Sequence, residues 1–175
     1  MDRENKYYIY VRSVLFLVIF IILHYLYKWF PYVVVSLFSG INESVYQHFK
    51  IGFYSYLILT IIEFTVFRKK IDDHKKFFFS HLLSAIIIPW IIFILFLIAA
   101  MFFGERHFII ELIYAISITY LTALCTSIFE QEIKKIEFSK RFKWLLLLFL
   151  VILIMEFTIF TFNLPWHDIF ADPYA

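Results

Sequence analysis

Residues 144–163 read Trp-Leu-Leu-Leu-Leu-Phe-Leu-Val-Ile-Leu-Ile-Met-Glu-Phe-Thr-Ile-Phe-Thr-Phe-Asn, and this stretch decides the class of fold. It is 20 residues long and contains one charged side chain, Glu156. A helix of about 20 residues is long enough to cross the hydrocarbon core of a bilayer. The alternative interpretation is a helix in the core of a large water-soluble protein. It is disfavoured because the charged residues of the chain lie mainly at the ends of its apolar stretches and not within them. The stretch therefore predicts a transmembrane helix.

Four further stretches have the same character, at about residues 10–29, 43–67, 77–103 and 107–129. Hydrophobic residues make up 63% of the chain and the mean hydropathy is +0.83, whereas an ordinary soluble domain is nearer half apolar. Pro89 lies near the middle of the third stretch and predicts a kink there. Residues 30–41 are apolar but too short to span, so we expect a re-entrant or interfacial segment. The sequence predicts an all-α integral membrane bundle of five transmembrane helices, forming one domain over residues 1–175.

The positive charges of the chain are distributed unevenly around these stretches. If the N-terminus is cytoplasmic, 13 of the 16 Lys and Arg residues lie on the cytoplasmic side. The positive-inside rule then predicts a multi-pass protein of the cell membrane with its N-terminus inside and its C-terminus outside. The formal net charge of +2 is too small to suggest nucleic acid as a partner.

The densest polar stretch is Gly40-Ile-Asn-Glu-Ser-Val-Tyr-Gln-His-Phe-Lys50, at the expected outer start of the second span. Asn42 is expected to cap a helix that begins at Glu43. The same topology places residues 104–107 and the tail 163–173 on the outer side. His107 and Glu111 are four residues apart and therefore share a helix face. The candidate catalytic residues are Glu43, Ser44, His48, Lys50, Glu111 and Asp168, and the polar residues expected inside the spans are His24 and Glu156.

Three interpretations of this outer cluster remain open. As a metal site, the ligands would be His48, His107, His167 and Asp172, with Glu43 as a further candidate, for zinc or another divalent metal. The i,i+5 spacing from Glu43 to His48 is awkward for two ligands on one helix. As metal-free chemistry, Ser44 and His48 would act as nucleophile and base. In the structural interpretation, His48 and Lys50 bond to the acidic tail, where Asp168 or Asp172 would pair with Lys50 or Arg106.

A second polar set lies near the expected inner side: Glu63, His81, Glu130 and Glu132. Because these residues flank basic loops, we expect them to form ordinary ion pairs at the membrane interface.

The stretch Asn42-Glu-Ser-Val-Tyr-Gln-His-Phe-Lys50 resembles the motif of a family of small multi-pass prokaryotic membrane proteins of unknown function, Asn-Glu-Ser-Val-Trp-Glu-His-x-Lys. The second motif of that family is matched by Pro165, Phe170, Asp172 and Pro173. The chain departs from the first motif at Tyr46 and Gln47, and it stops two residues after Pro173. The resemblance covers nearly the whole chain and implies no activity.

The leading functional hypothesis is a metal-dependent membrane enzyme that acts on a lipid or amphipathic substrate in an outer pocket. A transporter or proton-coupled permease is the alternative, in which His24, Glu111 and Glu156 would form the coupling site. Five spans leave no internal two-fold repeat, so the transporter would require a homo-oligomer. A third hypothesis is a non-catalytic membrane subunit. The partners expected are the bilayer, a small or lipid-like ligand and, for the transporter, a second copy of the chain.

Overall fold

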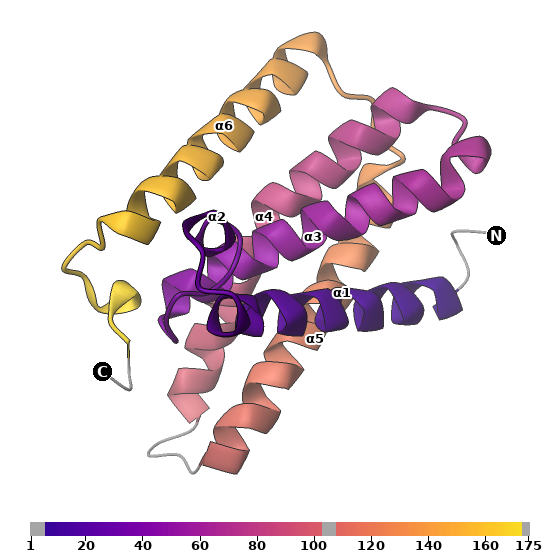
Figure 1. Ribbon diagram of the computed structural model, residues 1–175. Helices are drawn as coiled ribbons and strands as arrows, with labels where there is room; N and C mark the ends of the chain where they lie inside the picture. The colour runs from indigo at the N-terminus through magenta and orange to yellow at the C-terminus, as the bar shows by residue number, and fades with distance from the viewer. Residues whose placement is uncertain (1–5, 103–107, 173–175) are drawn as a thin grey trace.

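The computed structural model describes residues 6–102 and 108–172, and every regular element in these ranges is helical. Figure 1 shows the arrangement of the helices. Five of them are long and apolar enough to cross a membrane, which confirms the expected class of fold. The elements are α1 (Lys6–Trp29), α2 (Val33–Ser36), α3 (Val45–Phe67), η1 (Arg68–Lys70), α4 (His74–Phe102), α5 (Phe108–Ile133), α6 (Lys140–Phe162) and η2 (Asp168–Phe170).

Several helices extend past their apolar runs into charged sequence. α4 begins at His74, α5 ends at Ile133 and α6 begins at Lys140. Lysine and glutamate are good helix formers and extend to the membrane surface, so the backbone stays helical beyond the hydrocarbon core. α4 also continues as a helix through Pro89.

The start of α3 differs from the expected one. Its N-cap is Ser44, whose hydroxyl accepts a hydrogen bond from the backbone N–H of Gln47 at 3.4 Å. Asn42 instead accepts a hydrogen bond from the backbone N–H of Ser44 at 3.1 Å. The cap therefore falls two residues later than predicted, and Glu43 belongs to the preceding loop.

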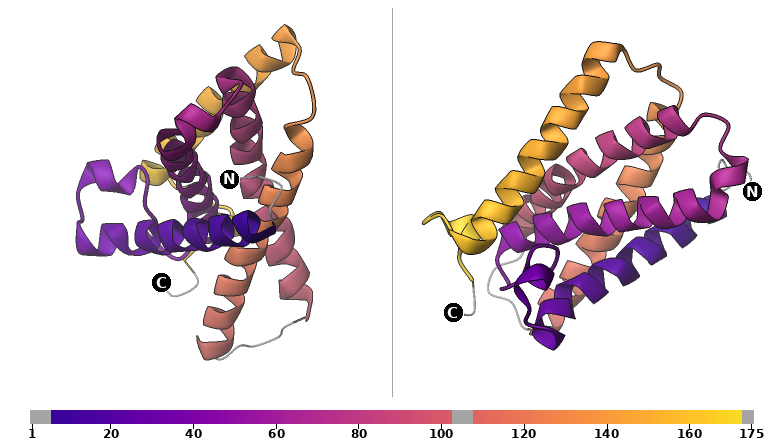
Figure 2. Two further views of the ribbon diagram at one scale, coloured as in Figure 1. Left: turned by 90° about the vertical axis from the view of Figure 1, so that its right-hand side faces the viewer. Right: turned by 45° about the horizontal axis from the view of Figure 1, so that its top comes forward.

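Helices α1, α3, α4 and α5 form the centre of the bundle, where α3 packs on α1 and α4 while α5 packs on the same two helices. α6 lies outside, against α4, and its Phe157 meets Phe53 of α3 with the ring centroids 5.4 Å apart. Gly52 allows the close approach of α3 to α4, since a Cβ atom there would lie 2.5 Å from Ile92 Cδ1. The right-hand view of Figure 2 shows α6 apart from α1 and α5.

Residues 30–44 fold back onto the end of α1. The buried Ser39 hydroxyl donates to the carbonyl of Leu23 and accepts from the N–H of Tyr27 at 2.9 Å. Meanwhile Tyr32, Val33 and Val34 are exposed. This segment therefore presents apolar side chains outward while its far end is fixed to α1. At the same end of the bundle, η2 packs against α3.

Candidate functional site

Three potential metal ligands converge where α1 ends and α3 begins: His24, Glu43 and His48. One ligand atom from each lies within 4.8 Å of the other two. His24 Nε2 is 3.3 Å from Glu43 Oε2, and the two imidazole centroids are 5.3 Å apart. We call these three residues the histidine–glutamate cluster.

Local structure orients both imidazoles. His48 lies in the first turn of α3, and its Nδ1 is 2.8 Å from the Ser44 carbonyl oxygen. A carbonyl only accepts, so Nδ1 carries the hydrogen and Nε2 of the neutral ring keeps its lone pair. In His24, Nε2 faces the Glu43 carboxylate, while the buried Nδ1 has no hydrogen-bond partner among the described residues. His48 therefore keeps an Nε2 lone pair, and His24 offers its Nε2 lone pair beside Glu43 when the ring hydrogen is on Nδ1.

Glu43 is the anionic member of the cluster. Hydrogen bonds from His24 and Lys28 lower the pKa of this carboxyl to about 2, against the opposing effect of burial. Lys28 Nζ is 2.7 Å from Glu43 Oε1, yet its side chain is 55% exposed. Two imidazoles and one carboxylate form a ligand set used by catalytic zinc, which keeps a fourth position for water. With bonds of ~2.1 Å, a tetrahedral site separates its ligand atoms by about 3.4 Å, so atoms 4.8 Å apart must close by about 1.4 Å.

The tail meets the residue 40–50 stretch at two points. Asp172 Oδ2 accepts from the backbone N–H of Glu43 at 3.4 Å, and the rings of Phe170 and Tyr46 are 4.5 Å apart. Lys50 does not join the tail as expected. It is buried and donates to the Ser36 carbonyl at 2.8 Å and to Thr161 Oγ1 at 2.9 Å.

The other predicted site residues lie in separate places. The hydroxyl of Ser44 is buried and serves as the cap of α3. His167 and Asp168 are exposed, and His167 Nδ1 accepts from the N–H of Ile169 at 3.4 Å. Glu111 lies in the first turn of α5 and Glu156 is half-buried on α6. The proposed metal ligand His107 falls outside the described residues, as do Arg106 and Pro173.

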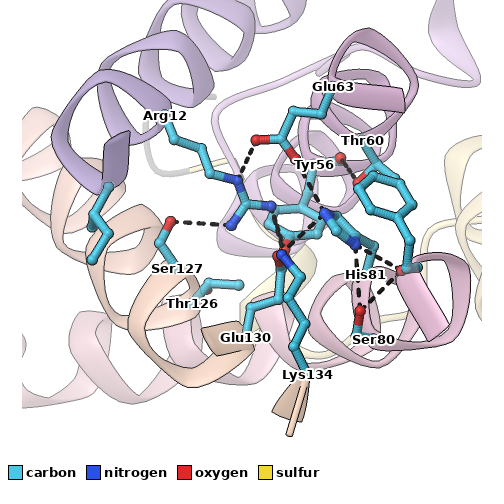
Figure 3. A network of polar contacts seen from close by, with 12 residues as sticks. Arg12, Tyr56, Thr60, Glu63, Ser80, His81, Thr126, Ser127, Glu130 and Lys134 are labelled. Carbon is cyan, nitrogen blue, oxygen red and sulfur yellow. Dashed lines mark hydrogen bonds and ion pairs between the residues drawn. The ribbon is translucent and has the colours of Figure 1, made fainter. Parts of the chain in front are cut away.

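A second polar cluster lies near the opposite ends of α1 and α3, and we call it the arginine network (Figure 3). Arg12 Nε is 2.6 Å from Glu63 Oε1, and Arg12 Nη2 is 2.7 Å from Glu130 Oε2. Arg12 also donates to the hydroxyls of Tyr56 at 2.8 Å and Ser127 at 3.3 Å. The guanidinium thus joins α1 to α3 and α5.

His81 adds α4 to the arginine network. Its Nε2 is 3.1 Å from Glu63 Oε2 and 3.2 Å from Glu130 Oε1. Glu63, His81 and Glu130 are only 5%, 1% and 1% exposed, so the prediction of ordinary interfacial ion pairs is wrong for them. That prediction does describe Glu132, an exposed partner of Lys135 at 2.7 Å.

Arg12 is not among the site residues predicted from the sequence. Two signals were available. Arg12 lies five residues inside the candidate span Tyr7–Trp29, and a charge at that depth requires a partner. In addition, Tyr8 precedes it by one helical turn, and the Tyr8 hydroxyl donates to Glu63 Oε1 at 2.8 Å.

The two clusters are separated by aromatic packing. Between Arg12 and His24, the buried face of α1 carries Phe16 and Phe20, and the Phe20 ring stacks on His48 at 6.3 Å. On α1, aromatic side chains therefore fill the space between the two clusters.

Among the protein families, the "Family of unknown function (DUF6512)" matches residues 1–175. The expectation of a family of unknown function that covers the chain is thereby confirmed. No curated protein and no solved structure matches the chain.

Proposed function

Since the chain belongs to this family of unknown function, we propose a function from its own geometry: a multi-pass membrane protein that binds a divalent metal at His24, Glu43 and His48. The observation that carries the proposal is the convergence of three ligand atoms from α1, the following loop and α3. Two imidazoles and one carboxylate are a ligand set of catalytic zinc and of non-haem Fe(II), and we propose zinc.

The most favoured activity is metal-assisted attack on an amphipathic substrate in the headgroup region. A bound metal would supply Lewis-acid polarisation of a substrate oxygen or an activated water. Near the cluster, Trp29, Tyr32 and Val33 are exposed apolar residues of the type that enters a membrane interface. The positive-inside rule favours the extracytoplasmic side of the cell membrane for this end of the bundle.

Lys28 relates metal binding to substrate charge. Its ammonium pairs with Glu43, so a metal that bound this carboxylate would release Lys28 beside the site. The exposed ammonium would then favour an anionic headgroup close to the metal. Lys28 orients the substrate in this scheme, and Glu43 holds the metal.

Metal binding is tested on protein purified in detergent with a tag that contains no histidine. Elemental analysis and calorimetric titration with Zn²⁺ are expected to give one site per chain. His24→Gln and His48→Gln should each weaken binding at least about 10-fold, because a three-ligand site loses a ligand. His167→Gln is the matched control, since this exposed imidazole lies outside the cluster. Equal zinc affinity in His24→Gln, His167→Gln and the unchanged protein would refute the site.

Activity is tested separately in vesicles that contain anionic phospholipid, by product analysis before and after metal removal. Turnover that depends on the metal and is lost in the Glu43→Gln variant would support the enzymatic role. One bound zinc without turnover would leave the metal site intact and reject the enzymatic role.

A further inference from the structure

The arginine network contains an arrangement that the metal proposal does not use: one imidazole held between two buried carboxylates. His81 Nδ1 is 2.7 Å from the backbone carbonyl oxygen of Phe77, in the previous turn of α4. On the other side of the ring, Nε2 lies 3.1 Å from Glu63 Oε2 and 3.2 Å from Glu130 Oε1. Both nitrogens therefore face oxygen atoms at hydrogen-bond distance.

Counting hydrogens shows that a neutral imidazole does not satisfy these contacts. The Phe77 carbonyl only accepts, so Nδ1 must donate to it. In a neutral ring Nε2 then keeps its lone pair and faces two ionised carboxylates, which is repulsive. The other tautomer satisfies Nε2 but turns the lone pair of Nδ1 toward the carbonyl. One additional proton on the ring lets Nε2 donate to the two carboxylates, and one on a carboxyl lets that carboxyl donate to the Nε2 lone pair.

We propose that Glu63, His81 and Glu130 form a buried proton-binding site, in which one dissociable proton is shared between the imidazole and the two carboxylates. Apart from Lys134, which contacts Glu130 Oε1, the rest of the network leaves the oxygens that face His81 to this proton. Arg12 binds the opposite oxygens, Glu63 Oε1 and Glu130 Oε2. The hydroxyls of Tyr8 and Tyr56 donate to the same two oxygens.

Lys134 provides the route to the aqueous surface. Its Nζ contacts Glu130 Oε1, the same oxygen that faces His81 Nε2. The Lys134 side chain is 22% exposed, whereas Glu130 and His81 are each 1% exposed. Burial lowers the pKa of Lys134, so its ammonium gives up a proton more readily than an exposed lysine does. One carboxylate oxygen thus connects a lysine near water to a histidine in the bundle.

Charge balance limits the site to one such proton. Glu63 and Glu130 carry two negative charges, and Arg12 supplies one permanent positive charge. In a medium of low dielectric, one more positive charge makes the cluster neutral, and a second would be costly. Lys134 and His81 therefore compete for the remaining proton across Glu130. When a proton moves from Lys134 to His81, one N–H bond breaks on the lysine and one N–H bond forms on the imidazole. No other reactant is needed.

The test follows the protonation of His81 in the full-length protein in detergent, labelled with ¹⁵N-histidine. The His81 resonance is assigned by its absence from His81→Gln. In the unchanged protein between pH 6 and 7, we expect either both ring nitrogens protonated or a protonated carboxyl in the infrared spectrum. That carboxyl band should be lost in Glu63→Gln or Glu130→Gln. A ring protonated only at Nδ1, together with fully ionised carboxylates down to pH 5, would overturn the proposal.

Substitutions of Lys134 give a second readout that a merely structural lysine would not produce. Lys134→Met removes the competing base, so the proton should stay on the His81 site to higher pH, with the titration midpoint raised by about one pH unit. Lys134→Arg fixes a positive charge beside Glu130 and should lower the midpoint. The control is Lys135→Met, because Lys135 is exposed and pairs with Glu132. If the His81 titration has the same midpoint pH in all of these proteins, the proposal of a shared proton is refuted.

Discussion

Replacing Arg12 by methionine should destabilise the protein severely. The substitution keeps an unbranched apolar side chain but removes the cation that faces Glu63 at 2.6 Å and Glu130 at 2.7 Å. Removing one partner from a buried ion pair costs about 3–5 kcal/mol, because the remaining charge is left without compensation. Both carboxylates are 5% exposed or less, but Lys134 still contacts Glu130, so the loss comes mainly from Glu63 and should fall within this range.

The free energy of unfolding is measured in mixed micelles by titration with a denaturing detergent, with helical circular dichroism as the signal. Lys69→Met is the control, since it removes an exposed cation and should change stability by no more than about 0.5 kcal/mol. Adding Glu63→Gln and Glu130→Gln to Arg12→Met should restore more than half of the loss, because the uncompensated charges are then gone. An Arg12→Met protein within about 1 kcal/mol of the unchanged chain would refute the reasoning.

Four further predictions concern other parts of the chain. Gly52→Ala should cost about 1–3 kcal/mol of unfolding free energy by overpacking, and Ile92→Val in the same chain should recover part of it, because it removes the atom 2.5 Å from the new methyl group. Ser39→Ala should cost about 1–3 kcal/mol and speed limited proteolysis of residues 30–44, because it removes the two hydrogen bonds that hold Ser39 against α1. Lys28→Met should tighten zinc binding in calorimetry, since no ammonium then competes for Glu43; weaker binding would contradict this competition. In the metal-free protein, the Glu43 carboxylate should contribute at most about 3 kcal/mol, and the stability difference from Glu43→Gln should disappear as the pH falls from 4.5 to 2, because the folded-state pKa is about 2.

Length and hydropathy were enough to predict the five apolar helices, because a helix that crosses a bilayer needs about 20 apolar residues whatever its neighbours are. The histidine–glutamate cluster was predicted only in part. Glu43 and His48 were judged an awkward pair because both were placed on one helix. With the cap at Ser44, Glu43 lies on the loop, and its carboxylate reaches His24 on α1.

The arginine network could not be predicted from local pattern. Its contacts join residues 51 and 118 positions apart, and they depend on which faces of four helices meet. In addition, a charged residue near the end of a span is usually exposed at the membrane surface, so its position in the sequence does not indicate burial. Only the packing of α1 against α3 and α5 shows that these charges are buried together.

The burial of Arg12 also has a consequence for biosynthesis. Arg12 belongs to the first span, while its two carboxylate partners are translated 51 and 118 residues later. At about 5–20 residues per second, roughly 3–10 s pass before Glu63 is made and about twice as long before Glu130 is made. An arginine inside an inserting segment opposes insertion by about 2.5–3.5 kcal/mol at the helix centre and by less near its end. The position of Arg12 five residues from the start of the span allows its guanidinium to reach the headgroups until the later helices arrive. During synthesis, the Arg12 guanidinium can therefore stay solvated among the headgroups until Glu63 and Glu130 are available to pair with it.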